Sequence, residues 1–273
     1  MTNSKILLSL LIVNFNSADF IKLSLYILSK ITKYPYKIYI LDNGSGNTDY
    51  EKLKKICSEH KNIILERTKT DLKGSIAHGT ALNYLVTKVD TPYFSILDAD
   101  ATWLKNNWDE ILINRLNDEI KVIGTQPYGD KPKDFPLMFA ILFETATFNS
   151  LNIDFRPKDV SQYQDTGHEL REKYLSAGYK GEVIYIRNTR EFHEGPFKNL
   201  IVAEYYLSEQ KGVFASHFGR GSTGGIAKYR GGQSIGLIYK IPFISFPLRY
   251  IRGHLEKKRW IKICKRIVEQ EMA

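Results

Sequence analysis

The stretch of sequence that decides the fold is Tyr93-Phe94-Ser95-Ile96-Leu97-Asp98-Ala99-Asp100. Four of its first five residues are aromatic or aliphatic, which predicts a buried strand. Alternate residues of a strand point the same way, so the carboxylates of Asp98 and Asp100 can converge where the strand opens into a loop. Two such carboxylates repel each other unless a cation lies between them, and a divalent cation that also contacts a phosphate is a suitable partner. The spacing alone leaves open that both aspartates are solvated loop residues.

Four apolar segments in the first hundred residues predict strands, and helical patterns lie between them. The predicted strands are residues 6–13, 37–41, 62–66 and 93–97, and the predicted helices are residues 18–32, 49–58 and 75–88. This alternation predicts an α/β fold with a mostly parallel sheet flanked by helices. Ligands bind at the carboxyl ends of the strands in such sheets. Asn14, Asn16, Asp42, Asp98 and Asp100 fall at those ends, which predicts one shared site.

The second half of the chain gives weaker patterns. We expect a helix around Trp103–Leu112, strands at 122–125 and 183–186, a strand or buried segment within 137–149, a helix at 165–177 and a glycine-rich loop at 214–225.

The positive charge of the chain is concentrated at its C-terminal end. The 273 residues carry a formal net charge of +9. Residues 226–273 hold eleven lysines and arginines against three glutamates, a net +8, which leaves +1 for residues 1–225. A nearly neutral body disfavours nucleic-acid binding, and a cationic tail favours an anionic surface as its partner.

The sequence also indicates a compartment. Cys57 and Cys264 predict neither a disulfide framework nor a metal cluster, so a reducing, cytoplasmic environment is expected. Residues 6–13 lead into a polar segment without a clear cleavage site, which favours a buried first strand over a signal peptide. No segment has the roughly 18 consecutive apolar residues that a membrane-spanning helix needs.

Four segments, in this order, resemble the motifs of family 2 glycosyltransferases with the GT-A fold. They are Leu11-Ile12-Val13-Asn14-Phe15-Asn16-Ser17, Leu41-Asp42-Asn43-Gly44-Ser45, the helical segment Gly74–Asn83 and Leu97-Asp98-Ala99-Asp100. The resemblance implies a GT-A domain over residues 1–225, followed by a basic, partly apolar extension over residues 226–273.

Two later segments are similar to the rhamnosyltransferase-like branch of that family. Residues 163–170, followed by Leu175-Ser176-Ala177-Gly178-Tyr179, resemble its acidic-residue helix, and Ser216–Thr223 resembles its loop rich in histidine and glycine. That branch usually has two acidic residues before the helix. Gln164 and Asp165 stand there in this chain, so one carboxylate is available.

The resemblance implies an enzyme of hexosyltransferase type, active in polysaccharide biosynthesis. Its donor would be a UDP-, dTDP- or GDP-sugar, and its acceptor a hydroxyl group of a glycan or a lipid-linked molecule, with inversion at the transferred sugar. The residues implied in nucleotide-sugar binding are Val13, Asn14, Phe15, Asn16, Asp42, Gly74, Asp98, Ala99, Arg220 and Ser222. Asp42 would accept a hydrogen bond from the base or the ribose, and an Asx turn is the alternative for it.

A divalent cation, Mn²⁺ or Mg²⁺, is implied at Asp98, Asp100 and His217. The ion would bridge the two phosphates of the donor and act as a Lewis acid on the departing nucleotide. Imidazole is an acceptable ligand for Mn²⁺, although a loop histidine can also be merely solvated. Arg220 and Ser222 would donate hydrogen bonds to the phosphates.

Asp165 is the expected general base, which would take the proton of the acceptor hydroxyl in a single displacement. Its place before a predicted helix leaves the role of N-cap open. His168, His193 and Glu144 are the other candidates for the base.

The tail joins apolar segments at 235–239 and 241–248 to a basic helix. This combination suits an anionic membrane surface and would place the protein at the inner face of the membrane. A basic helix packed on the body is the alternative. Pro242 and Pro247 argue against one continuous helix there.

Two other function classes compete with sugar transfer. A nucleotidyltransferase would carry a glycine-rich loop with lysine or arginine directly after its first strand, and Asn14-Phe15-Asn16-Ser17 lacks these residues. A non-catalytic module that binds carbohydrate or membrane would have no need of Asp98, Asp100, Asp165 and His217 together.

Overall fold

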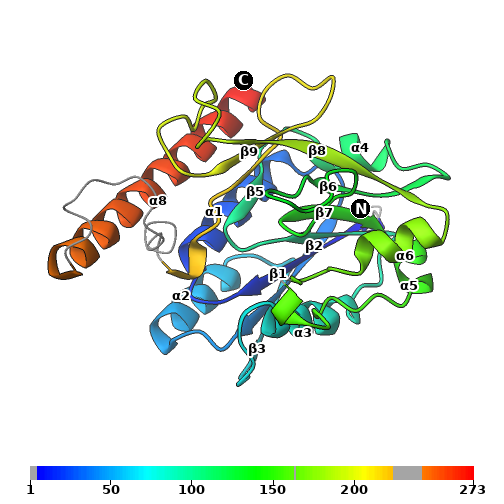
Figure 1. Ribbon diagram of the computed structural model, residues 1–273, viewed down its shortest axis with the longest axis horizontal. Coiled ribbons are helices and arrows are strands. Elements are labelled where there is room, and N and C mark those ends of the chain that lie inside the picture. Colours follow the sequence, from blue (N-terminus) through cyan, green and yellow to red (C-terminus); the bar gives the residue numbers. More distant parts are fainter. Residues whose placement is uncertain (1–4, 163, 224–241) are drawn as a thin grey trace.

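A mixed sheet of ten strands forms the centre of the computed structural model, which describes residues 5–162, 164–223 and 242–273 (Figure 1). The strands are β1 (Leu8–Asn14), β2 (Tyr36–Asn43), β3 (Ile63–Thr68), β4 (Tyr93–Leu97), β5 (Ala101–Trp103), β6 (Ile120–Thr125), β7 (Ala140–Glu144), β8 (Lys180–Asn188), β9 (Ala203–Tyr206) and β10 (Ala215–His217). Their order is β3-β2-β1-β4-β7-β6-β8-β9-β10-β5. The first four of these strands and the pair β6–β8 are parallel, and the other neighbours are antiparallel.

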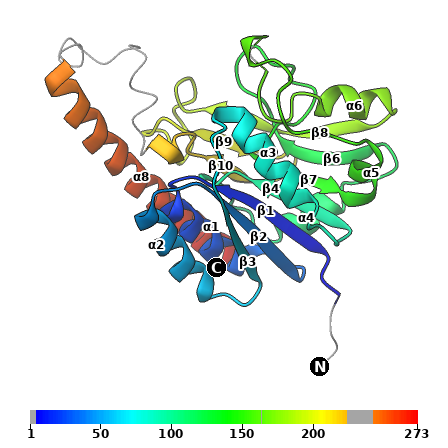
Figure 2. The same cartoon turned by 90° about the horizontal axis from the view of Figure 1, so that it is seen from below.

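Helices cover both faces of the sheet (Figure 2). They are α1 (Ala18–Ile31), α2 (Asn47–Ser58), α3 (Gly74–Val86), α4 (Trp108–Ile113), α5 (Thr145–Ser150), α6 (Leu170–Ser176) and α8 (Pro242–Met272), with short 3-10 turns η1 (Val160–Gln162) and η2 (Gly221–Thr223). The seven elements predicted up to residue 97 are all present, and the α/β fold with a GT-A-like arrangement is confirmed.

The strand β1 shows why the core has two parts. Leu8, Leu10 and Ile12 are fully buried on the face covered by α1, α2 and α8, whereas Leu11 is buried on the face covered by α3, α5 and α6. Successive side chains of a strand point to opposite faces, so an uninterrupted apolar run belongs to a strand that is covered on both sides.

The turn between β4 and β5 joins an inner strand of the sheet to the last strand of the order. β4 lies fourth in the sheet, but β5, only three residues later, is the last strand and pairs with β10. The sheet therefore curls around this turn. Backbone hydrogen bonds fix it on both sides: the Asp98 N–H donates to the Phe139 carbonyl at 2.8 Å, and the Phe218 N–H donates to the Asp100 carbonyl at 2.9 Å.

Three expectations about individual elements were wrong. The helix expected from Trp103 begins at Trp108, because Asn107 is left-handed (φ 54°) and Trp103 belongs to β5. The helix expected from Asp165 begins at Leu170, because Gly167 (φ 75°) interrupts it. The loop expected at 214–225 contains β10 and η2.

The helix α8 is continuous through Pro247, against the expectation that two prolines would divide it. Pro242 is the first residue of the helix, where its missing N–H removes no intrahelical hydrogen bond. The apolar segment 235–239 and residues 224–225 of the glycine-rich loop lie outside the described residues.

The second half of α8 packs against α1 (Figure 1). Trp260, Cys264 and Val268 are fully buried there, and the Trp260 ring lies 5.7 Å from the ring of Phe20 on α1. Of the two alternatives for the tail, packing on the body therefore holds for this half of the helix. No helix in the described part of the chain is both long enough and apolar enough to span a bilayer.

Candidate functional site

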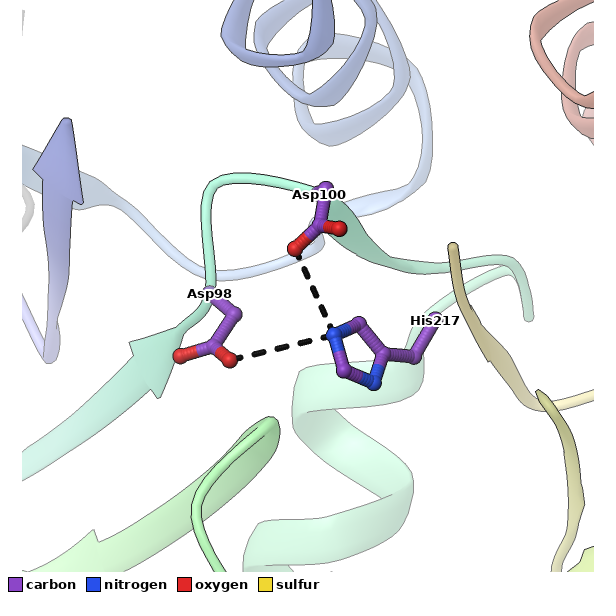
Figure 3. Close-up of side chains that lie close together, drawn as sticks. All are labelled: Asp98, Asp100 and His217. Atoms are coloured by element: carbon purple, nitrogen blue, oxygen red, sulfur yellow. Dashed lines mark ion pairs between the residues drawn. The ribbon is translucent and has the colours of Figure 1, made fainter. Parts of the chain in front are cut away.

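Asp98, Asp100 and His217 converge at the turn between β4 and β5 (Figure 3). His217 Nε2 lies 3.3 Å from Oδ1 of Asp100 and 3.9 Å from Oδ2 of Asp98. The sheet register explains this approach, because His217 ends β10 directly opposite Ala101, the residue that follows Asp100. One potential ligand atom from each side chain lies within 4.8 Å of the others.

The pKa values of Asp98 and Asp100 are shifted in opposite directions. Burial opposes ionisation of Asp100, but His217 and the N–H groups of Arg220 and Gly221, each 2.7 Å from its Oδ2, outweigh that effect and lower its pKa. Burial, followed by the charges of Asp100 and Asp165, raises the pKa of Asp98 well above its usual range. A cation at this place would relieve the repulsion between the two carboxylates.

The residues fit a hard or borderline divalent cation. Oδ1 of Asp98 is buried and accepts no hydrogen bond from the described residues. A buried carboxylate oxygen without a donor costs free energy, and a metal ion would satisfy it. Two carboxylates and one imidazole form a donor set that Mn²⁺ accepts readily.

Neighbouring aromatic side chains hold His217 in place. The imidazole stacks on the Phe139 ring at 4.3 Å with an interplanar angle of 26°. The preceding Ser216 accepts a hydrogen bond from Nε1 of Trp260 on α8 at 2.9 Å. The orientation of His217 thus depends on packing contributed by distant parts of the chain.

Two adjoining cavities lie beside this cluster, and the first contains it. One, of 370 Å³, is lined by Val13, Phe15, Ser17, His78, Asp98, Ala99, Asp100, His217, Gly219, Arg220, Gly221, Ser222 and Thr223. The other, of 790 Å³, is lined by Val13, Phe15, Asn43, Gly44, Thr70, Asp71, Leu72, Lys73, Gly74, Ala77, His78 and Ser222. The shared lining makes a continuous cleft along the carboxyl ends of the strands. Seven residues predicted for nucleotide-sugar binding line it: Val13, Phe15, Gly74, Asp98, Ala99, Arg220 and Ser222.

The other three predicted binding residues, Asn14, Asn16 and Asp42, do not line the cleft. Asp42 is fully buried; its carboxylate accepts a hydrogen bond from Asn14 Nδ2 at 2.8 Å and lies 3.2 Å from Nε of Arg67. Asn16 is left-handed (φ 52°) and its side chain accepts a hydrogen bond from the Gly46 N–H. In this structure these side chains fix the loops that follow β1 and β2.

Arg220 differs from the expectation that its side chain faces the phosphates. Its guanidinium is fully buried, lies 4.2 Å from the centre of the Phe218 ring and pairs with Glu256 of α8. Its backbone N–H, in contrast, points to Asp100. Of the two predicted phosphate donors, Ser222 is the one that lines the cleft and is exposed.

Asp165 lies beside a smaller cavity of 200 Å³ and accepts hydrogen bonds from Ser75 Oγ at 2.5 Å and Lys131 Nζ at 3.2 Å. Burial opposes its ionisation, but Ser75 and Lys131 outweigh burial and lower its pKa. The N-cap position of α6 belongs to Glu169, so Asp165 has no capping role there.

The other three candidates for the general base lie in different parts of the structure. His168 lines the same small cavity as Asp165. Glu144 pairs with Lys121 at 3.1 Å and bonds to Thr147. The structure does not bring His193 into either of the cavities that contain Asp98 or Asp165.

His78 also lines the site, although no role was predicted for it from the sequence. Its Nε2 lies 3.8 Å from Oδ1 of Asp98, and its Nδ1 lies 3.5 Å from the hydroxyl of Thr166, next to Asp165. Burial lowers its pKa to about 4, so the imidazole is neutral near pH 7. Its place in the first turns of α3, a helix that begins at the carboxyl ends of the strands, was the available signal.

Comparisons with known proteins agree with this architecture. The sequence matches the family model of glycosyl transferase family 2 over residues 9–176. The mannosyltransferase PcManGT from Pyrobaculum calidifontis, solved with GDP-Man and Mn²⁺, is 17% identical, with a TM-score of 0.51 over 64% of this chain and 54% of that one. TarS of S. aureus (residues 1–349) is 15% identical, with a TM-score of 0.46 over 62% of this chain and 56% of that one.

The chain spans about half the length of these two solved structures. No curated protein matches it. The family model covers more than half of the chain, and its match ends at Ser176, the last residue of α6, and includes both aspartates of the β4–β5 turn. The chain belongs to glycosyl transferase family 2.

Proposed function

We propose that this chain is a metal-assisted hexosyltransferase that uses a nucleotide sugar and inverts the configuration of the transferred sugar. The observation that carries the proposal is the convergence of Asp98, Asp100 and His217 on one side of the cleft, with a buried oxygen of Asp98 that accepts no described hydrogen bond. The complex of PcManGT with GDP-Man and Mn²⁺ is consistent with such a site on this fold. Membership of the rhamnosyltransferase-like branch is part of the proposal.

The larger part of the cleft would hold the nucleoside. Phe15 is 48% exposed on its wall and offers a ring face to a base. The hydrogen bonds of Asn14, Asn16 and Asp42 would keep this wall in place, and Gly74 would let α3 begin beside the ligand. UDP-, dTDP- and GDP-sugars are the donor classes to compare.

The metal site would receive the diphosphate. Asp98, Asp100 and His217 would hold Mn²⁺ or Mg²⁺, which when bound neutralises charge on the leaving nucleoside diphosphate. Ser222 and the backbone around Ala99 line the same cavity and would contact the donor. The N–H groups of Arg220 and Gly221 would keep the Asp100 carboxylate oriented.

Asp165 would act as the general base. The acceptor hydroxyl gives its proton to the Asp165 carboxylate while its oxygen forms a bond to the anomeric carbon. The bond from that carbon to the diphosphate breaks, and the electron pair leaves with the nucleotide. Attack from the face opposite the leaving group inverts the anomeric configuration. Lys131, which donates to Asp165 in this structure, would have to yield its place to the acceptor hydroxyl.

The cavity beside Asp165 would receive the acceptor. The cavity beside Asp165 combines Phe135, Pro136 and Leu137 with the cations Lys131 and Arg171. Such a lining suits a sugar hydroxyl carried on a glycan or on a lipid-linked phosphate in polysaccharide biosynthesis. In this proposal, residues 1–225 form the catalytic domain and residues 226–273 form an extension. The protein would act in the cytoplasm.

Calorimetric titration with UDP, dTDP, GDP and CDP, each with and without Mn²⁺, tests the donor site. We expect one nucleotide to bind tightly only with Mn²⁺, and Asp100→Asn to abolish that dependence. Asp118→Asn, a neutralised carboxylate on an exposed residue outside the cleft, is the matched control. Transfer from the corresponding nucleotide sugars then tests catalysis. Absence of nucleotide binding under every condition would falsify the proposal, and binding without transfer would favour a non-catalytic module.

A further inference from the structure

The helix α8 has two contrasting faces. The face toward the body contains the buried residues Gly253, Glu256, Trp260, Cys264 and Val268, which follow one another at intervals of three or four. The opposite face carries Leu248, Ile251, Leu255, Lys258, Arg259, Lys262, Lys265 and Arg266, all exposed and spaced in the same way. Residues three or four apart lie on the same side of a helix, so the second set forms one continuous outward face.

The first half of this outward face is apolar. Ile251 and Leu255 are 54% and 50% exposed, and Leu248 is 36% exposed. Tyr250, 55% exposed, belongs to the same two turns but lies on another side of the helix. Isolated exposed apolar residues are ordinary, but three on one side of a helix within about two turns form a patch of the kind that mediates contact with a partner or a membrane.

The second half of the face is cationic. Lys258, Arg259, Lys262, Lys265 and Arg266 occupy it without an acidic residue between them. Glu256, the acidic residue of this part of the helix, is turned to the body and buried. Five of the eleven lysines and arginines of residues 226–273 therefore lie on the same side of α8 as the apolar patch, whereas residues 1–225 carry a net charge of only +1.

We propose that the outward face of α8 docks on an anionic lipid bilayer. The apolar side chains would enter the boundary between head groups and acyl chains, and the cations would lie on the anionic head groups. From Leu248 to Arg266 the helix is about 27 Å long at about 1.5 Å per residue, so the whole face can lie along a membrane plane. The first half of α8 extends beyond the body in both views (Figures 1 and 2).

The observations favour a bilayer over other anionic partners. A nucleic acid would engage the cations but would leave the apolar patch exposed to water. An anionic bilayer pairs with both halves of the face at once, because an apolar layer lies directly beneath its charged surface.

This docking surface extends the proposed function, because it would bring the catalytic cleft to the surface where a lipid-linked acceptor resides. The docking itself needs no catalysis. A vesicle-binding assay without donor or Mn²⁺ therefore fails or succeeds independently of the proposed transfer activity.

The test is co-sedimentation of the full chain with phosphatidylcholine vesicles and with vesicles that contain phosphatidylglycerol. We expect binding to the anionic vesicles, weakened by salt, and at most weak binding to neutral ones. The variant Arg259→Gln/Lys262→Gln/Arg266→Gln and the variant Ile251→Gln/Leu255→Gln should each weaken binding tenfold or more. Glutamine is a good helix former, so the exposed face changes while the helix remains.

Matched controls make the result specific to α8. Lys54→Gln/Lys61→Gln/Lys198→Gln removes three exposed charges elsewhere, and Val160→Gln/Leu175→Gln removes one exposed apolar side chain from η1 and one from α6. Both controls should bind as the unaltered chain does. The proposal is overturned if anionic vesicles are not bound, if neutral vesicles bind equally well, or if the controls weaken binding as much as the α8 variants. Binding of a DNA duplex without vesicle binding would also overturn it.

Discussion

Nη1 of Arg220 donates to Oε2 of Glu256 at 2.9 Å, and the guanidinium is fully buried. The backbone N–H of the same Arg220 donates to Asp100 at 2.7 Å. One residue thus connects α8, near the C-terminal end, with a proposed metal ligand in the first half of the chain.

The first prediction concerns this connection. Glu256→Gln keeps the shape of the side chain but removes the charge opposite a buried guanidinium. Loss of one partner of a buried ion pair costs about 3–5 kcal/mol, so a clear fall in the melting temperature is expected. Because the Arg220 loop also supports Asp100, the Mn²⁺ dissociation constant should rise about tenfold or more. Mn²⁺ binding followed by electron paramagnetic resonance measures this directly.

Two further variants separate charge from simple destabilisation. Glu269→Gln, an exposed position on the same helix, should change neither stability nor Mn²⁺ affinity. Arg220→Met/Glu256→Met removes both charges and should recover most of the stability lost by the single variant, since a buried pair is often replaceable by apolar residues. Unchanged Mn²⁺ affinity in a folded Glu256→Gln protein would refute the connection.

The second prediction uses the close contact of Gly221 with the metal cluster. A Cβ atom at this position would lie 2.8 Å from Cβ of Asp100 and 3.0 Å from Oγ of Ser17. Gly221→Ala should therefore displace the Asp100 carboxylate and lower Mn²⁺ affinity, whereas the melting temperature should change little because the contact lies at the cavity. Gly46→Ala, where the nearest atom of Asn16 would be 3.7 Å away, is the control in a neighbouring loop.

The third prediction is that the metal site destabilises the metal-free protein. Asp98 is held close to Asp100, and burial together with that negative charge disfavours its ionised form. Asp98→Asn removes the repulsion, so the chain without metal should melt at a higher temperature; a gain of about 1 kcal/mol corresponds to roughly 2–4 °C. The same variant should lose the stabilisation by Mn²⁺ that the unaltered chain shows in thermal melts. If Asp98→Asn melts at a lower temperature than the unaltered chain when both are in EDTA, the prediction is wrong.

The strands and helices up to Leu97 were predictable because apolar runs mark the strands and polar turn residues separate them from the helices. The apolar run of β1 and the turn residues after β2 belong to local patterns that tertiary packing reinforces. The prediction was weaker past Asp100, where left-handed Asn107 and Gly167 end or delay helices without any change in apolar period.

The metal cluster was predictable in composition but its assembly was not. His217 reaches Asp100 through the pairing of β10 with β5, two strands of three residues each that carry almost no local signal. The direction of the Arg220 side chain was also beyond sequence reasoning, because it depends on Glu256, 36 residues later. Long-range pairs of this kind become visible only when the fold brings them together.

The fourth prediction concerns Asp165. Asp165→Asn should lower kcat by about 10²–10⁴-fold, as expected for loss of a general base, and should leave nucleotide and Mn²⁺ binding unchanged. The measurement is the initial rate of transfer beside calorimetric binding of the nucleotide. A variant that retained full kcat would remove Asp165 from the mechanism and direct attention to His168, which lines the same cavity.

The last prediction concerns the direction in which the transfer rate changes with pH. Burial opposes ionisation of Asp165, but Ser75 and Lys131 together lower its pKa below the ordinary value of 3.8. A general base acts when ionised, so transfer should persist above this low pKa and fall as the pH decreases through it. Lys131→Ala removes a donor and a positive charge, which raises the pKa and should move the acid limb of the kcat profile toward neutral pH. Lys133→Ala, in the same loop but bonded to the Pro127 carbonyl, should leave the limb in place, and equal shifts in both variants would refute the role of Lys131.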